Sequence, residues 1–224
     1  RQRQMCIRGR FIIIRVLLFV LLVVGTTSAM IAQDNDFTTW TKFKVNHKID
    51  SRFAVSGNLE LRTEDDMSAI DRWGISVGGD YRAFSFLKFE IGYETHYRNL
   101  GEIGWKFRHR YRIGATASFR YQWLKMSLRE RFQQTFDRGE SETRLRSRLK
   151  LGYAPQKGIV SPYFSIEIYQ SLDDAPFWRT ARLRYRPGIE IDLTKRWSLD
   201  AFYCYQYESS RGKHIAGVEV GYSF

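Results

Sequence analysis

The chain has 224 residues, a formal net charge of +12 and a calculated isoelectric point near 9.8. Beyond its first few dozen residues, no segment is long and apolar enough to cross a membrane as a helix, which excludes a helical membrane protein. The mean hydropathy of −0.42 is ordinarily that of a soluble domain, but a β-barrel has an equally low mean because only alternate residues meet lipid.

The first 32 residues have the features of a signal peptide. Arginines at positions 1, 3, 8 and 10 precede an unbroken apolar run over residues 16–24, and small residues follow at 25–29. We expect cleavage after Ala29 or after Ala32. An uncleaved anchor helix is the alternative, but the stretch from Phe11 to Val24 contains Arg15 and is shorter than the ~20 apolar residues that a span needs.

The expected mature protein, residues 33–224, is a single domain. Cleavage removes five arginines and no acidic residue, so the formal net charge falls from +12 to about +7. Cys6 leaves with the signal peptide and Cys204 remains, so the mature chain can form no intramolecular disulfide. Small soluble secreted domains more often carry such bridges.

Alternation of apolar and polar residues dominates this domain and predicts β-strands. Within residues 87–98, Leu87, Phe89 and Ile91 share one face, whereas Lys88 and Glu90 share the other. Helical periodicity fits none of these segments. The candidate strands are eleven segments: 37–47, 52–62, 71–82, 87–98, 105–118, 123–136, 143–153, 162–171, 179–192, 196–208 and 214–224.

Short turns alternate with longer connectors between these segments. The short turns fall near positions 50, 85, 121, 156 and 195, and the longer polar connectors cover 63–69, 99–104, 137–142, 172–176 and 209–213. Short periplasmic turns and longer outer loops are typical of bacterial outer-membrane proteins, so we predict an all-β, antiparallel up-and-down transmembrane β-barrel of ten to twelve strands. Single-chain bacterial barrels normally have an even number, so we expect ten or twelve strands and one error among the eleven segments.

Aromatic residues gather at both ends of the predicted strands, as in the two girdles that mark the bilayer interfaces. The short-turn set is Phe84, Phe86, Phe119, Tyr121, Trp123 and Trp197, and the long-loop set is Trp73, Tyr97, Trp105, Phe136, Trp178 and Tyr207. Three polar residues, His109, Glu130 and Gln134, fall on the face that should meet lipid. Either a β-bulge shifts the register there, or the faces of those strands are assigned wrongly.

The last segment alternates strictly and ends in an aromatic residue. Val218, Val220, Tyr222 and Phe224 occupy one face. Outer-membrane barrels present a final strand with a terminal aromatic residue to their insertion machinery. Tyr222 and Phe224 are therefore the predicted assembly signal, and the barrel-assembly machinery is an expected partner.

Several short motifs resemble a known family. They are Trp40 in the first strand, Gly57-Asn58-Leu59-Glu60-Leu61-Arg62, Asp71-Arg72-Trp73-Gly74 followed by Tyr81-Arg82, and Gly92-Tyr93. Together with the signal peptide and the terminal aromatic residue, they make the chain resemble a bacterial outer-membrane family of uncharacterised barrels, domain of unknown function 2490. The resemblance covers most of the mature chain and implies an outer-membrane location and a barrel. It implies no activity and no catalytic residue.

The face opposite to the expected lipid face is unusually basic. Arginine or lysine occupies successive inward positions on three consecutive strands and on one strand further round. These candidate ligand-binding residues are Lys106, Arg108, Arg110, Arg112, Lys125, Arg129, Arg131, Arg144, Arg146, Arg148, Lys150, Arg182, Arg184 and Arg186. Inward acids are fewer, and we expect them to lie away from the densest basic run. Some arginines would then keep water or anions as partners.

Two interpretations of this interior are open. A hydrated interior would favour anions, because guanidinium groups bind carboxylate and phosphate through paired hydrogen bonds. The protein would then be a narrow anion-preferring pore or an anionic-ligand-binding barrel. Alternatively, ion-paired side chains fill the interior, and the barrel is a structural scaffold without transport. The expected partners are outer-membrane lipid, lipopolysaccharide and small anionic solutes, and we expect a monomer.

A hydrolase at the outer rim is the competing class of function. It would need histidine, serine and carboxylates near the long loops. The candidates are Asp65, Asp66, Asp173, Asp174, His96 and His214. Paired aspartates in a loop are usually just solvated, and the sequence has neither a G-x-S-x-G nor an H-E-x-x-H motif. We therefore predict no catalytic residue.

Metal, cofactor and nucleic-acid binding have little support in the sequence. The four histidines are scattered and Cys204 has no suitably spaced partner, so we predict no metal and no cofactor. The basic residues point into a barrel and not onto an exposed face, which argues against nucleic acid. An open soluble barrel, such as a lipocalin-like carrier, is the fallback if the two aromatic bands prove false.

Overall fold

The structure is a computed structural model that describes residues 36–224, except for residues 138, 156–157, 174–177 and 209–210. The predicted signal peptide and both of its cleavage sites therefore lie outside the described residues. Within the described part of the chain, no helix has the length and apolar character that a membrane span requires.

Alternating sequence becomes extended strand throughout the described residues, with one 3-10 helix, Gly101–Ile103, between the fourth and fifth strands. The eleven strands are β1 Asp36–Lys48, β2 Phe53–Glu64, β3 Ala69–Arg82, β4 Leu87–Asn99, β5 Trp105–Tyr121, β6 Leu124–Asp137, β7 Glu140–Tyr153, β8 Val160–Ser171, β9 Arg179–Asp192, β10 Trp197–Glu208 and β11 Arg211–Ser223. Each boundary lies within three residues of the predicted one, so alternation alone located all eleven strands.

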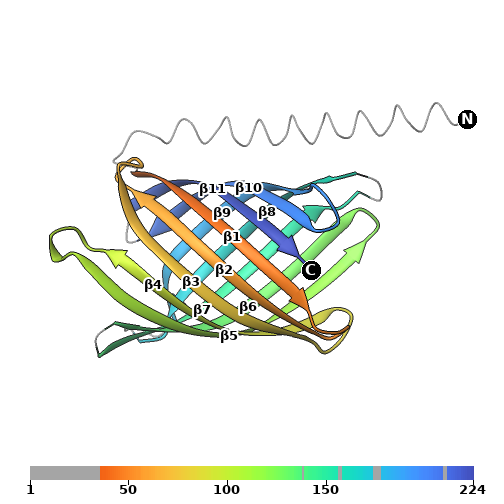
Figure 1. Cartoon of the computed structure of the whole chain (residues 1–224), viewed down its shortest axis with the longest axis horizontal. Coiled ribbons are helices and arrows are strands. Elements are labelled where there is room, and N and C mark those ends of the chain that lie inside the picture. The colour runs from red at the N-terminus through yellow and green to blue at the C-terminus, as the bar shows by residue number, and fades with distance from the viewer. Residues whose placement is uncertain (1–35, 138, 156–157, 174–177, 209–210) are drawn as a thin grey trace, which may run out of the picture. The chain divides into compact units, whose positions relative to one another are not determined.

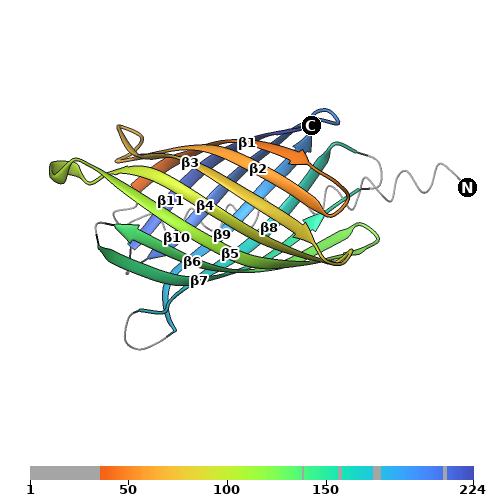
Figure 2. The same ribbon diagram turned by 60° about the horizontal axis from the view of Figure 1, so that its bottom comes forward.

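The strands form a closed barrel in which each pairs with its sequence neighbours and β1 pairs with β11. Figures 1 and 2 show the tilted strands on all sides of the barrel. Neighbouring strands are antiparallel except at the β1–β11 seam, which is parallel from Asp36 opposite Lys213 to Asn46 opposite Ser223. A meander of odd strand number closes this way because its first and last strands run in the same direction.

The predicted all-β up-and-down barrel is therefore confirmed, and the eleven strands of the described residues lie within the expected range of ten to twelve. The preference for an even number was wrong. The first segment joins the wall as β1 and no further strand was missed in this part of the chain.

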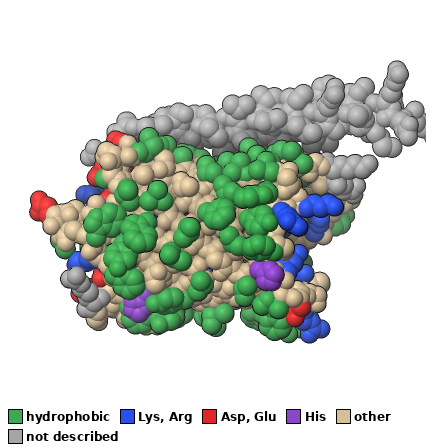
Figure 3. Space-filling view, viewed as in Figure 1, with side chains coloured by type: hydrophobic (Ala, Val, Ile, Leu, Met, Phe, Trp, Pro, Cys, Tyr) green, Lys and Arg blue, Asp and Glu red, His purple; other side chains and the backbone are tan. Residues whose placement is uncertain are grey.

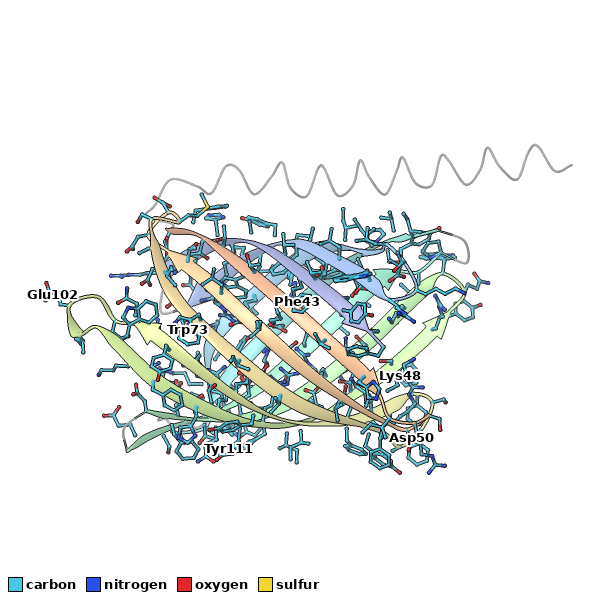
Figure 4. All side chains as sticks on the ribbon, viewed as in Figure 1. Phe43, Lys48, Asp50, Trp73, Glu102 and Tyr111 are labelled. Carbon is cyan, nitrogen blue, oxygen red and sulfur yellow. The ribbon has the colours of Figure 1, made fainter. Side chains whose placement is uncertain are left out.

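Short turns and longer loops lie at opposite ends of the barrel. In Figure 4, Lys48 and Asp50 lie at one end, and Trp73 and Glu102 lie at the other. Two expected long connectors are shorter than predicted, because β6 ends at Asp137 and β7 begins at Glu140, and because β11 begins three residues after β10 ends. The polar residues there continue the strands beyond the apolar band, which the sequence pattern did not distinguish from loop.

The outer face of the wall is apolar. Ile91 is 64% exposed and many other large hydrophobic side chains are also exposed, which would be unfavourable in water. Figure 3 shows hydrophobic side chains across the wall and charged side chains near its two ends. Aromatic rings meet at both ends of this face: Phe86 stacks on Phe119 with centroids 5.9 Å apart, and Trp73 stacks on Tyr97 at 5.1 Å.

Three polar residues interrupt this apolar face where the sequence placed them. The β5–β6 register runs without a break from His109 opposite Phe136 to Tyr121 opposite Leu124, so a bulge there is ruled out and the assigned face is correct. The His109 ring stacks on the Phe136 ring, with centroids 5.1 Å apart. The Glu130 carboxylate accepts a hydrogen bond of 2.6 Å from the Ser147 hydroxyl on the next strand.

A small apolar cluster reinforces the inner side of the seam region. Phe202, Cys204 and Ile215 are buried and Trp40 packs against them. Parallel pairing is slightly weaker per residue than antiparallel pairing, so packing across β1, β10 and β11 supports the closure. Gly217 is required in this cluster because a Cβ there would overlap the Phe202 ring.

Candidate functional site

The predicted basic residues occupy alternate positions of their strands and face the barrel interior, which is called the lumen. On β6 and β7, Arg129 lies opposite Arg148, and Arg131 lies opposite Arg146. Directly opposed like charges repel each other across a strand pair. The fold therefore requires carboxylates from other strands to reach these arginines.

Glu167 of β8 provides most of that compensation. One of its oxygens, Oε1, lies 2.6 Å from Arg146 Nη2, 3.3 Å from Arg129 Nη2 and 3.8 Å from Arg148 Nε. Its other oxygen lies 3.7 Å from Arg184 Nη1. Glu167 is only 4% exposed. Glu167 and these four arginines are called the Glu167 cluster below.

The expectation that inward acids lie away from the densest basic run was wrong for Glu90 and Glu94, whose strand pairs with β5, and for Glu167. Its strand pairs directly with β7, and Glu167 stands opposite Arg148. A single glutamate among apolar and polar residues of β8 gave no signal that it would pair with four arginines. Strand order was needed to see it.

Two glutamates of β4 reach the arginines of β5 and β6. Glu90 Oε1 accepts a hydrogen bond of 2.5 Å from Arg131 Nε, across the intervening strand β5. Glu94 pairs with Arg110 at 3.2 Å and with Arg112. The Arg112 side chain lies flat against the wall at Gly92, where a Cβ would collide with the guanidinium group.

The other predicted lumen residues form separate pairs. Their N–O distances are 2.7 Å for Arg108 with Asp137, 2.5 Å for Lys150 with Glu190, 2.6 Å for Arg182 with Glu208, and 2.7 and 3.0 Å for Arg186 with Asp200 and Glu219, and Arg144 pairs with Glu142. Among the described residues, Lys106 and Lys125 have no ion pair. The predicted basic residues therefore lie among carboxylates in small ion-paired groups and do not form one uninterrupted basic wall.

Aromatic rings contact several of these cations, and these contacts were not predicted from the sequence pattern. Arg184 lies 4.7 Å from the Trp40 ring centroid and 4.8 Å from that of Tyr169. Arg186 lies 3.4 Å from the Phe202 centroid. Such contacts stabilise a cation that is removed from water. The sequence pattern could have predicted these contacts, because these aromatic residues lie on the same inward face of their strands as the basic residues.

A cavity of about 40 Å³ lies in the loop-end half of the lumen. It is called the arginine cavity below. Its wall contains seven arginines and no carboxylate, and the residues are Arg62, Arg72, Arg110, Gln133, Thr135, Arg144, Arg146, Tyr169, Arg182 and Arg184. Arg62 and Arg72 were absent from the sequence prediction, although both continue the polar face of their strands. Within the described residues, the buried Nε atoms of Arg144 and Arg146 have no hydrogen-bond partner.

The candidate residues of an outer-rim hydrolase do not converge. Asp66 accepts a hydrogen bond from the Phe37 backbone N–H at 3.0 Å, and Asp173 accepts one from a backbone N–H of β7. His96 is buried in the lumen, whereas His214 bonds Tyr203 on the outer wall. In the part of the chain that the structure describes, no hydrogen bond or ion pair joins either histidine to a carboxylate.

The remaining rim candidates add no catalytic geometry. Asp65 lies with Asp66 and Met67 in a turn of three positive φ angles, where its backbone carbonyl accepts hydrogen bonds from Ser68. Asp174 lies outside the described residues. Of the described residues, no three His, Cys, Asp or Glu side chains are grouped so that they could hold a metal ion.

The predicted assembly residues lie at the short-turn end of β11. The Tyr222 ring lies 4.8 Å from the Trp197 ring and 5.0 Å from the Phe224 ring. Phe224 donates a backbone hydrogen bond of 3.1 Å to Asn46 of β1 and is 65% exposed. An exposed aromatic residue beside the seam is compatible with an assembly signal, and that role stays a prediction.

Comparison with known sequences decides the family. The family described as "Protein of unknown function (DUF2490)" matches residues 37–215, which span ten strands and the start of the eleventh. The chain belongs to this family. The resemblance predicted from Trp40 and the other short motifs is thus confirmed.

Other known proteins add little. No curated protein matches the sequence. Among solved structures, the barrel is similar to the "Translocator domain of autotransporter NalP from Neisseria meningitidis". The similarity has 15% sequence identity and a TM-score of 0.46, and it covers 75% of this chain and 73% of that one.

Proposed function

We propose that this protein is an outer-membrane β-barrel that binds small anionic solutes in its lumen and passes them as a narrow, anion-preferring conduit. In the state described here the Glu167 cluster closes that conduit. Outer-membrane lipid and lipopolysaccharide surround the barrel as a monomer, and the barrel-assembly machinery recognises its last strand. The protein has no catalytic role and uses no cofactor.

The outer face supports the membrane location. A wall whose exposed residues include Ile75, Val77 and Ile91 on neighbouring strands is stable only against another apolar phase. The exposed rings at both ends of this wall occur where the bilayer interfaces would lie.

The charge imbalance around the arginine cavity carries the proposal of anion binding. The cavity arginines pair with six carboxylates: Glu60, Asp71, Glu94, Glu142, Glu167 and Glu208. Eleven arginines in all share these six acids, since Arg98, Arg112, Arg129 and Arg148 pair with them too. Buried cations in such excess favour anions as further partners.

A closed structural barrel without transport is the second candidate, and the burial of the lumen favours it. Glu167, Tyr169 and Arg184 are each at most 5% exposed, so solvent hardly reaches the lumen beside β8 and β9. A conduit requires these ion pairs to rearrange, whereas a scaffold requires them to persist. The two candidates thus differ in whether the barrel ever conducts ions.

Single-channel recording in planar bilayers tests the proposal. Across a KCl gradient, the purified barrel is expected to carry current whose reversal potential lies closer to the equilibrium potential of chloride than to that of potassium. The double variant Arg110→Glu with Arg146→Glu should shift the reversal potential towards the equilibrium potential of potassium. Three arginines of the Glu167 cluster remain in this variant, so the new carboxylates still have cationic neighbours.

Arg196→Gln, a change of charge in the exposed β9–β10 turn, is the matched control and should leave the reversal potential unchanged. An absence of current at every voltage from a folded wild-type barrel would remove the conduit and leave the scaffold. A reversal potential unaffected by the double variant would remove the role of the arginines in selectivity.

A further inference from the structure

The arginine cavity has the dimensions of an ion site. Its volume of about 40 Å³ exceeds the ~10–15 Å³ that one water molecule requires. It is far below the ~300 Å³ at which pockets for drug-sized organic ligands begin. An occupant must therefore be one small ion and not a sugar, a nucleotide or a lipid headgroup.

The wall of the cavity selects the sign of that ion. Seven guanidinium groups from β2, β3, β5, β7 and β9 surround the space, and none of the lining residues is acidic. The carboxylates that pair with these arginines stand behind them: Arg110, for example, is held by Glu94 at 3.2 Å and by the Thr135 hydroxyl at 2.8 Å. Some N–H groups of each guanidinium thus fix the side chain, and the remaining N–H groups can donate to an ion in the cavity.

Unused donors point to an oxyanion and not to a halide. Arg110 donates from Nε and Nη1 to Thr135 and Glu94, and Arg182 donates from Nε and Nη2 to Glu208, so each keeps further N–H groups that have no acceptor among the described residues. Gln133 and Thr135 add neutral polar groups to the same wall. A tetrahedral oxyanion has several acceptor oxygens, so each fixed donor around the cavity can bond to a different oxygen. A halide is a single acceptor atom and cannot offer the donors separate partners.

We propose that the arginine cavity is a binding site for a single free tetrahedral oxyanion of the size of inorganic phosphate, held by Arg110, Arg144, Arg146 and Arg182. This site rests on the proposed function, since it is the position at which an anion stops within the lumen. It also neutralises part of the arginine excess, so the bound ion stabilises the barrel. Free ions and lipid phosphates share this chemistry, and the size of the cavity favours the free ion.

Calorimetric titration of the refolded barrel in a phosphate-free detergent tests the site. Inorganic phosphate is expected to bind the wild type with one ion per barrel, and sulfate should compete with it. Arg144→Gln should weaken binding by about tenfold or more, because a charge-assisted donor is lost. This variant should fold, since the side chain of the partner Glu142 is 45% exposed and water can solvate it after the loss.

Matched controls separate the cavity from the rest of the surface. Arg196→Gln makes the same charge change in an exposed turn and should bind phosphate as the wild type does. Arg144→Lys keeps the charge but loses the planar fork, and it should bind more weakly than the wild type. A thermal unfolding midpoint that rises with phosphate in the wild type, and less so in Arg144→Gln, would support the same site.

Four outcomes of the titrations in detergent would overturn the proposal, and a fifth concerns added lipid. They are no phosphate binding by the folded wild type, equal binding by Arg144→Gln, equal loss in Arg196→Gln, and chloride binding as tight as that of phosphate. Phosphate binding that requires added phospholipid would also overturn it, since it would place the site at a headgroup. A barrel that conducts anions but binds no phosphate would leave the proposed function intact and remove only this site.

Discussion

Replacing Glu167 with glutamine removes one negative charge from the lumen and changes almost nothing else. The side chain keeps its size, and the amide oxygen can still accept a hydrogen bond from Arg146, which now donates to both carboxylate oxygens at 2.6 and 2.8 Å. Four arginines lose their shared counter-ion. The barrel is then expected to lose a large part of its stability.

The magnitude follows from burial. The Glu167 side chain is 6% exposed, and its cationic partners Arg129 and Arg184 are 12% and 7% exposed, so solvent screens these pairs little. Breaking one buried ion pair by removing a partner costs about 3–5 kcal/mol. Arg146 makes the closest contact and the other three lie between 3.3 and 3.8 Å, so we expect about 3–5 kcal/mol for the whole change and not a multiple of it.

Urea unfolding of the refolded barrel in lipid vesicles, followed by tryptophan fluorescence, measures the loss. Glu142→Gln is the matched control, because its side chain is 45% exposed and pairs with Arg144 near the rim. That control should cost at most about 1 kcal/mol. Adding Arg146→Met to Glu167→Gln should recover part of the lost stability, since one uncompensated cation leaves with it.

A Glu167→Gln barrel as stable as the wild type would refute the reasoning. It would mean that the lumen is hydrated enough to screen four guanidinium groups, and the closed state described above would be wrong. A loss of equal size in Glu142→Gln would be equally damaging. It would show that any change of lumen charge unfolds the barrel, with no special role for the Glu167 cluster.

Three further predictions concern the wall and a turn. Gly217→Ala should destabilise the barrel by about 1–3 kcal/mol, because its methyl group meets the Phe202 ring, whereas Gly79→Ala, whose methyl group would meet only Ile91 at an ordinary van der Waals distance of 3.8 Å, should cost almost nothing in the same urea assay. Glu130→Leu should stabilise the barrel in vesicles by about 1–2 kcal/mol, since it removes a carboxylate from the apolar outer face, and a loss of stability would show that its hydrogen bond with Ser147 outweighs that cost. Two backbone N–H groups of its own turn donate to Asp50 and lower its pKa. The Asp50 carboxylate therefore stabilises the barrel at pH values above its ordinary pKa, and this contribution is lost as the pH falls through the lowered pKa. The stability difference between wild type and Asp50→Asn should therefore shrink in acid, and a difference that grows there would contradict the sign.

The strands were predictable because their environment has two sides. Leu87, Phe89 and Ile91 face outward and Lys88 and Glu90 face inward, and a period of two follows from that geometry alone. The same argument placed His109 and Glu130 correctly on the outer face, against the expectation that polar residues avoid it. The sequence pattern indicated eleven strands, but we expected an even number because most single-chain bacterial barrels have one.

The ion pairs of the lumen were not predictable from periodicity. Alternation shows that Arg131 and Glu90 face inward, but their contact crosses a strand and depends on barrel curvature and side-chain reach. The pairing of Glu167 with four arginines of β6, β7 and β9 depends on register and side-chain reach, which the predicted strand order alone does not provide. Arg62 and Arg72 were missed for a simpler reason, since neither belongs to a run of arginines on successive inward positions of its strand.

The most direct test of the central claim, that the lumen holds more buried cations than carboxylates and recruits an anion to the arginine cavity, is an anomalous-scattering map from crystals of the barrel grown in selenate. The account predicts one strong peak inside the cavity, within hydrogen-bond distance of Arg110 and Arg144. A closed barrel of this structure with no peak there, and with selenate only at its surface, would contradict it.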